Sequence, residues 1–177
     1  MEALQSKRNV LICHYQADIL YPKQKKFDCG NPIINKYVQD SLKKSVRDGY
    51  CAAKALIDGE SGELLGVCTY TGYSLTKDKV SSVIPGSLPN DIAVIRLIML
   101  GVVHHEQKKG YGLDLLSEFF KQVRTVHQTL PIKGIYLDAD AKAVGFYTRL
   151  GFTPLKESTH AVGTVPMFLG IQHLLAV

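Results

Sequence analysis

The most informative segment of the chain reads Leu100-Gly-Val-Val-His-His-Glu-Gln107-Lys-Lys-Gly110-Tyr-Gly112-Leu-Asp-Leu-Leu116. It begins inside an apolar run, residues 92–103, whose Ile and Val content predicts a buried central strand. A polar loop follows, and apolar residues at helical spacing come after the two glycines. Gly110 and Gly112 let the backbone approach a ligand closely, and the N–H groups and dipole of a helix N-terminus favour an anion. The segment therefore predicts a strand, loop and helix that hold a phosphate group.

Two common phosphate-binding loops are excluded at this position. A dinucleotide-binding fingerprint needs a third glycine where the chain has Leu115, and a P-loop needs Gly-Lys followed by Ser or Thr. Lys108 and Lys109 add positive charge to the loop. On spacing alone, a plain glycine-containing turn at a helix start remains the alternative.

Apolar periodicity in the rest of the chain predicts a mixed α/β domain with the element order β-α-β-β-β-α-β-α-β-β. The first helix begins at Pro32, with Asn31 as its N-cap, and ends at Gly49. The second follows Gly112, and the third spans residues 140–150. Residues 77–90 are expected to form a loop. The predicted strands are residues 9–15, 51–57, 64–73, 92–103, 132–137, 152–155 and 164–169.

The composition is that of one ordinary globular domain spanning residues 1–177, with 46% apolar and 21% charged residues. Disorder and fibrous repeats are excluded. The formal net charge of +5 permits an anionic partner without demanding one. The longest apolar run is too short to cross a membrane, no signal peptide is visible, and the four cysteines are scattered. A cytoplasmic protein with reduced thiols and no membrane association is expected.

Two motifs together resemble one superfamily. The first is Gln107-x-x-Gly110-x-Gly112, which resembles the acyl-CoA signature of the GNAT superfamily of N-acetyltransferases. The second is Asp140-Ala-Lys-Ala-Val-Gly-Phe146-Tyr147-Thr-Arg-Leu-Gly151-Phe152, which resembles the second signature of that superfamily. The resemblance implies a single-domain GNAT fold, with a mixed, mostly antiparallel central sheet flanked by helices. It also implies acetyl-CoA as co-substrate and a CoA-binding core at about residues 92–155.

Two further blocks narrow the resemblance to acetyltransferase toxins of bacterial toxin–antitoxin pairs. They are Phe27-Asp28-Cys29-Gly30-Asn31 and Met167-Phe168-Leu169. This resemblance implies an enzyme that acetylates the α-amino group of aminoacyl-tRNA and so blocks translation. It also implies a ribbon-helix-helix antitoxin as partner, and homodimers are common in the superfamily. Two alternatives are a GNAT enzyme that acetylates a small-molecule or protein amine, and a degenerate GNAT module without activity.

The resemblance assigns roles residue by residue. Tyr147 would be the general acid that protonates the departing CoA thiolate, because a phenol with a pKa near ~10 stays protonated at neutral pH. The alternative for Tyr147 is an aromatic side chain packed beside Phe146. Asp140 stands where relatives often have an Asn that touches CoA. The residues expected to bind the cofactor are Leu100, Gly101, Val102, Gln107, Lys108, Lys109, Gly110, Tyr111, Gly112, Leu113 and Asp140.

No general base is evident on the central strand, since residues 92–103 contain no carboxylate. A lysine side chain, with a pKa near ~10.4, needs such a base far more than an α-amine near ~7.7–8.0. We therefore hypothesise that the acceptor is an amine of low pKa, such as the α-amine of an aminoacyl ester. Glu106, Glu118 and Asp138 could act as bases through water. Arg96 lies three residues before the position of an arginine common in the toxins.

A basic stripe recurs at helical spacing on the first predicted helix: Lys36, Lys43, Lys44 and Arg47. It predicts contacts with tRNA phosphates, since RNA is recognised largely through shape and backbone. A solvated helix face is the alternative. A metal site at His104-His105-Glu106 is not expected, because adjacent residues on an extended segment point in opposite directions.

Overall fold

The structure is a computed structural model that describes residues 8–155 and 163–176. The described residues fall into two compact units. The first lies within Met1–Thr69 and Met99–Phe119, and the second within Tyr70–Ile98 and Phe120–Val177. Strands β3 (Leu64–Thr76) and β4 (Asp91–Val102) and helix α4 (Tyr111–Thr129) contribute residues to both units. One domain over residues 1–177 stays a prediction.

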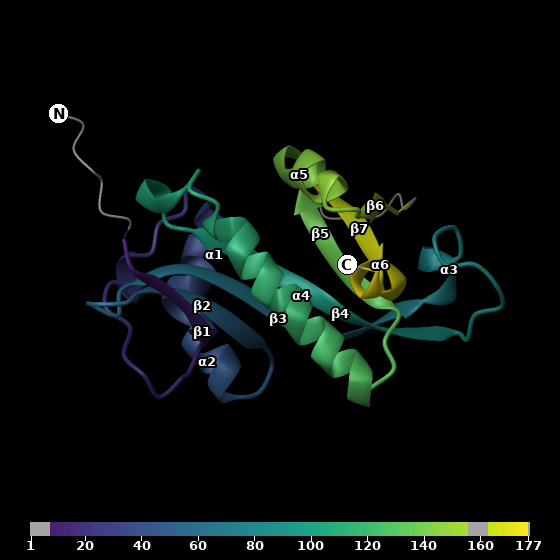
Figure 1. The fold of residues 1–177 in the computed structure, drawn as a ribbon, viewed down its shortest axis with the longest axis horizontal. Helices are drawn as coiled ribbons and strands as arrows, with labels where there is room; N and C mark the ends of the chain where they lie inside the picture. The colour runs from purple at the N-terminus through teal and green to yellow at the C-terminus, as the bar shows by residue number, and fades with distance from the viewer. Residues whose placement is uncertain (1–7, 156–162, 177) are drawn as a thin grey trace. The chain divides into compact units, whose positions relative to one another are not determined.

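The first unit contains strands in the order β1-β2-β3-β4. Strand β1 (Val10–His14) pairs antiparallel with β2 (Ala52–Asp58), with Leu11 opposite Ile57, and Figure 1 shows the two side by side. The first turns of α4 pack closely on β3. A Cβ atom added to Gly66 would lie 3.1 Å from Cδ1 of Leu115 and 3.2 Å from the carbonyl oxygen of Gly101, so a side chain at this position would be tightly packed.

The helical segment predicted from Pro32 to Gly49 begins and ends as expected, but it is not one regular helix. It consists of α1 (Pro32–Lys36), a π-helical turn η2 (Tyr37–Ser41) and α2 (Leu42–Arg47). Asn31 caps α1 by accepting from the N–H of Ile33 at 3.0 Å, as predicted. The π turn keeps the spacing of the buried Val38 and Leu42 intact, so the apolar period alone cannot reveal it.

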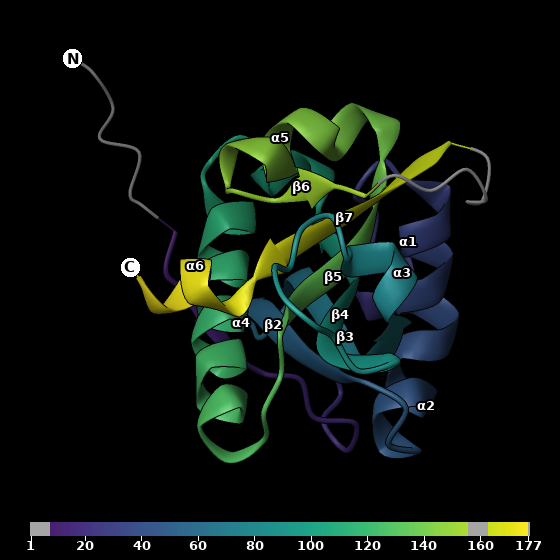
Figure 2. The ribbon, with the colours of Figure 1, turned by 90° about the vertical axis from the view of Figure 1, so that its right-hand side faces the viewer.

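The second unit contains strands in the order β3-β4-β5-β7-β6. Strand β5 (Gly134–Asp140) runs parallel to β4, with Ile95 opposite Ile135. It runs antiparallel to β7 (Thr164–Gly170), which also pairs with β6 (Thr153–Pro154), and Figure 2 shows β7 continuing into α6 (Ile171–Leu175). The apolar core of this unit includes Leu75, Val80, Ile92, Val94, Tyr136, Leu155 and Phe168. A mixed, mostly antiparallel sheet with helices is thus confirmed.

Several short helices were not predicted or were predicted differently. The expected loop 77–90 contains α3 (Lys77–Val80), and the expected helix 140–150 divides into a 3₁₀ turn η4 (Ala141–Ala143) and α5 (Val144–Arg149). Helix α6 and the 3₁₀ turn η1 (Gln24–Lys26) were missed. One or two turns are too short to show a helical period. No helix among residues 8–155 and 163–176 is long and apolar enough to cross a membrane.

Candidate active site

Strand β4 is followed by the 3₁₀ turn η3 (His104–Glu106) and then by the glycine loop, residues 107–113. The last three residues of this loop form the start of α4. His104 and His105 therefore lie in the loop that was predicted to follow the strand, and not on an extended segment as the argument against a metal site assumed. Lys108 adopts φ +62° and Gly110 φ +88°, which bends the chain sharply before the helix. The first helical hydrogen bond runs from the N–H of Asp114 to the carbonyl of Gly110 at 3.1 Å. The N–H groups before Asp114 therefore have no acceptor within the helix and are available to a ligand.

A cavity of about 280 Å³, called here the loop cavity, lies against this helix start. A Cβ atom added to Gly110 or Gly112 would meet no atom within 4 Å, so both glycines face open space rather than packed side chains. Of the predicted cofactor residues, Lys109 and Leu113 do not line the cavity, and Asp140 belongs to the second unit. The lining residues are Cys29, Asn31, Ile34, Leu100, Gly101, Val102, Glu106, Gln107, Lys108, Gly110, Tyr111 and Gly112.

Gln107 holds two walls of the loop cavity together. Its side-chain Nε2 donates to the carbonyl oxygens of Cys29 at 2.8 Å and Val102 at 2.9 Å. The N–H of Cys29 in turn donates to Oδ1 of Asn35 at 2.8 Å, which fixes the segment before α1. The block at residues 27–31, quoted above for its resemblance to the toxins, thus has a structural role beside the cavity.

Glu106 is a buried carboxylate in the wall of the loop cavity, only 3% exposed. It pairs with Arg8, and its Oε2 accepts from Nζ of Lys109 at 2.8 Å. Burial raises the pKa of Glu106, but the hydrogen bonds from Lys109 and Arg8 outweigh burial and leave the pKa below its ordinary value. A carboxylate held by two cations is a poor proton acceptor, so Glu106 is unsuited to the role of base.

Tyr147 lies on α5 in the second unit and is buried. Its ring makes edge-to-face contacts with Phe146 and Phe152, with centroids 5.1 and 5.5 Å apart. These contacts fix the ring, as expected for a packed aromatic side chain. The role of the Tyr147 hydroxyl as general acid stays a prediction. Asp140 caps η4, where its Oδ1 accepts from the N–H of Lys142 at 2.9 Å.

Arg96 and Asp138 form a cluster with two tyrosines in the second unit. Nη2 of Arg96 lies 3.1 Å from Oδ2 of Asp138, and the hydroxyl of Tyr136 donates to Oδ1 at 2.9 Å. The Arg96 guanidinium also lies over the ring of Tyr73, 5.2 Å from its centroid. Burial and the hydrogen bond to Asp138 raise the pKa of Tyr136, which keeps its hydroxyl a donor.

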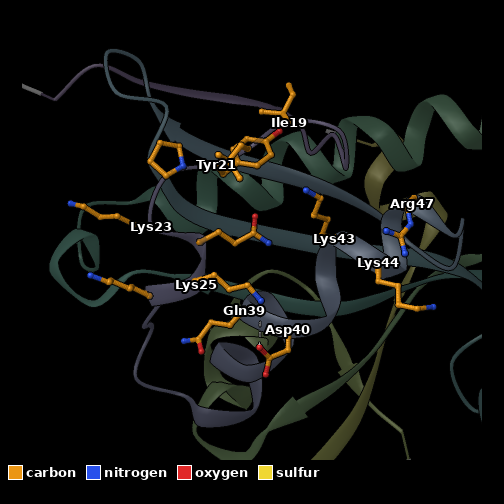
Figure 3. A pocket seen from close by; sticks show the side chains of 13 residues that line it. Ile19, Tyr21, Lys23, Lys25, Gln39, Asp40, Lys43, Lys44 and Arg47 are labelled. Atoms are coloured by element: carbon orange, nitrogen blue, oxygen red, sulfur yellow. Dashed lines mark ion pairs between the residues drawn. The ribbon is translucent and has the colours of Figure 1, made fainter.

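A second cavity, of about 650 Å³, lies between residues 19–26 and the η2–α2 segment (Figure 3). We call it the basic groove, because six cationic side chains line it with a single carboxylate, Asp40. Lys43, Lys44 and Arg47 of the predicted basic stripe are brought together here, whereas Lys36 is not. Residues 19–26 line the other side, and they include Lys23, Lys25 and Lys26. Sequence analysis missed these lysines, although three lysines within four residues are a visible signal.

The cations of the basic groove differ in their partners. Nζ of Lys44 lies 2.5 Å from Oδ2 of Asp48, which also pairs with Arg47 at 3.1 Å. Lys25 pairs with Asp40 at 3.7 Å. Within residues 8–155 and 163–176, neither Lys26 nor Lys43 has an ion pair. These two side chains therefore offer the least compensated charge of the groove. In the described part of the chain, no group of three His, Cys, Asp or Glu side chains could hold a metal ion.

Comparison with known proteins shows which fold the chain has. No family model matches the sequence, and no curated protein matches it. Among solved structures, the toxin AtaT complexed with acetyl-methionyl-tRNAfMet has a TM-score of 0.81 at 22% identity, covering 95% of this chain and 98% of that chain. A tyrosine-to-phenylalanine variant of AtaT, bound to acetyl-CoA and the C-terminus of the antitoxin AtaR, has a TM-score of 0.77 at 21% identity, covering 94% and 96%. The fold is thus that of the toxin AtaT, which agrees with the GNAT-toxin fold that the sequence resemblance implied.

A further solved structure, described as a bacterial toxin, is far more similar. It shares 60% identity with this protein, covers 96% of this chain and 95% of its own, and has a TM-score of 0.93. The chain belongs to the family of this bacterial toxin.

Proposed function

We propose that the protein is an acetyl-CoA-dependent N-acetyltransferase, a toxin that acetylates the α-amino group of an aminoacyl-tRNA and so blocks translation. The observation that carries this proposal is the loop cavity, built at a helix start by residues 100–102 and the glycine loop, in a chain 60% identical to a bacterial toxin. The GNAT toxin AtaT, which has been solved with acetyl-CoA and with an acetylated tRNA, supports the same reaction.

The residues of the loop cavity fit the anionic end of acetyl-CoA. The N–H groups at the start of α4 would bind the pyrophosphate, and the open space at Gly110 and Gly112 lets that group approach the backbone. Residues 100–102 would pair with the pantetheine through their backbone. Bound acetyl-CoA supplies the thioester acetyl group that is transferred. Tyr147 would give its Oη proton to the departing sulfur.

The site favours an acceptor amine that needs little help in losing its proton. Residues 92–103 contain no carboxylate, and Glu106 is neutralised by Arg8 and Lys109. The α-amine of an aminoacyl ester meets this condition better than a lysine side chain does. The basic groove would bind the phosphate backbone of the RNA. A DNA-binding antitoxin is the proposed partner. The proposed location is the cytoplasm, where aminoacyl-tRNA is present.

The proposal is tested by transfer of radiolabelled acetyl from acetyl-CoA into bulk aminoacylated tRNA. We expect label in the RNA fraction that disappears when the aminoacyl ester is hydrolysed, and a sharp fall with Tyr147→Phe. Sequencing the labelled tRNAs then identifies the amino acid and tRNA. Label in small amines or peptides but not in RNA would support the acetyltransferase activity and overturn the proposed acetylation of aminoacyl-tRNA.

A further inference from the structure

A buried carboxylate is an unfavourable neighbour for a site that binds an anion. Glu106 lines the loop cavity and is 3% exposed, so its charge is poorly screened by water. An uncompensated negative charge there would repel the pyrophosphate that the cavity is proposed to hold. The cavity can therefore accept an anion only if other groups neutralise Glu106.

Two cations from different parts of the chain provide this neutralisation. Lys109, inside the glycine loop, lies 2.8 Å from Oε2 of Glu106, and Nη1 of Arg8 pairs with Oε1. Arg8 precedes β1 and does not line the cavity, so it approaches Glu106 from outside. Both oxygens of the carboxylate are occupied by this arrangement, which also fixes the position of the Lys109 side chain.

Arg8 is itself held in place by the turn between β2 and β3. Its Nε lies 2.5 Å from Oδ2 of Asp58, and its Nη2 lies 3.4 Å from Oε2 of Glu63. Both carboxylates are buried, and Asp58 also accepts from the N–H groups of Glu60 and Ser61 at 2.9 and 2.8 Å. Guanidinium groups suit such multiple carboxylate contacts because their donors form a rigid planar fork.

We propose that Arg8 is a positioning residue of the pyrophosphate site: it neutralises Glu106 and so keeps the glycine loop able to bind the anionic end of CoA. This inference rests on the proposed binding of acetyl-CoA. Arg8 acts through Glu106, without touching the ligand. The negative charge of Glu106 serves to hold Lys109, and Arg8 prevents that charge from acting on the ligand.

The test is the affinity for CoA, measured by titration calorimetry and independent of any acetylation. We expect Arg8→Ala to weaken CoA binding about tenfold, a change typical of coupling between neighbouring sites. Arg8→Lys should retain part of the affinity, because it keeps the charge but loses the planar fork of donors. Adding Glu106→Gln to Arg8→Ala should restore binding, because the carboxylate charge that repels the ligand is then gone.

A second ligand separates this electrostatic role from a purely structural one. S-acetylpantetheine lacks the pyrophosphate, so its binding, followed by NMR titration, should not change in Arg8→Ala. Lys77→Ala, which removes an exposed cation on α3 of the second unit, is the matched control and should leave CoA affinity unchanged. If Arg8→Ala does not fold, Arg8→Gln with and without Glu106→Gln takes its place.

The outcomes distinguish this inference from the proposed function. A wild-type protein that does not bind CoA would overturn the proposed function. Wild-type affinity in Arg8→Ala would overturn the role of Arg8 while leaving the function intact. Equal loss of CoA and S-acetylpantetheine, or failure of Glu106→Gln to restore CoA binding, would show that Arg8 only supports the fold.

Discussion

Gln107 donates from its side-chain amide to the carbonyl oxygen of Cys29 at 2.8 Å, although 78 residues separate the two in sequence. The same nitrogen donates to the carbonyl of Val102 at 2.9 Å. A glutamine of the glycine loop thereby joins the end of β4 to the segment before α1. The Gln107 side chain thus links two parts of the cavity wall by hydrogen bonds.

Replacing Gln107 by Glu should destabilise this wall. The side chain keeps its size, but it loses the N–H donors and places a carboxylate against two carbonyl oxygens. Leaving buried acceptors unsatisfied costs about 1–3 kcal/mol, so thermal unfolding should occur at lower temperature and CoA should bind more weakly. Gln128→Glu, at an exposed position of α4, is the matched control. Equal stability of the two variants would contradict the bracing role.

Tyr147→Phe should lower activity sharply. The ring contacts with Phe146 and Phe152 involve no hydroxyl, so the variant keeps both of them. General acid catalysis contributes typically about 10²–10⁴-fold, and kcat should fall within that range. The measurement is single-turnover acetyl transfer alongside CoA affinity. Tyr50→Phe, at an exposed position, serves as control, and a fall in CoA affinity with unchanged kcat would contradict the assignment.

Binding of tRNA to the basic groove should depend more on the lysines without an ion pair among the described residues, Lys26 and Lys43, than on the paired Lys44. Lys26→Ala and Lys43→Ala should each weaken tRNA binding and lower the slope of log affinity against log salt by about one, as expected for one lost phosphate contact. Lys44→Ala should have a smaller effect, because that lysine already pairs with Asp48 at 2.5 Å. Filter binding at several salt concentrations measures both quantities. Unchanged slopes in all three variants would indicate a merely solvated face.

Low pH should destabilise the ion pairs that Arg8 forms with Asp58 and Glu106. Hydrogen bonds from the N–H of Ser61 and from Arg8 hold the pKa of Asp58 well below its ordinary value of 3.8. The pKa of Glu106 also lies below its ordinary 4.5. A lowered pKa in the folded state means stability that is fully present above the ordinary value and is lost as pH falls below it. The melting temperature should therefore begin to drop at about pH 5 and continue to drop below about pH 3, and Arg8→Ala should flatten that drop. A drop of the same size in Arg8→Ala would contradict this account.

The sequence predicts the parts of the structure that depend on short-range patterns. The central strand, the glycine loop and α4 follow from an apolar run, two glycines and a helical period, and all three are confirmed. The contacts of Arg8 with Glu106 and of Gln107 with Cys29 join residues 98 and 78 positions apart, and no local pattern encodes them. The basic groove was predicted only on its helical side, because the lysines around η1 belong to a turn without periodicity.

Gly134 should be among the least replaceable positions of the second unit. A Cβ atom there would lie 2.2 Å from the carbonyl oxygen of Leu169 and 2.7 Å from Cζ of Phe168, across the β5–β7 pairing. A backbone oxygen cannot move aside without breaking the strand pair, so Gly134→Ala should lower the free energy of unfolding by about 1–3 kcal/mol or more. Gly145→Ala is the matched control, because its Cβ would meet only Nη1 of Arg149 at 3.7 Å and alanine favours the helix α5. Urea unfolding of both variants should show a lower midpoint for Gly134→Ala and an equal or higher one for Gly145→Ala, and equal midpoints would contradict the close packing of β5 on β7.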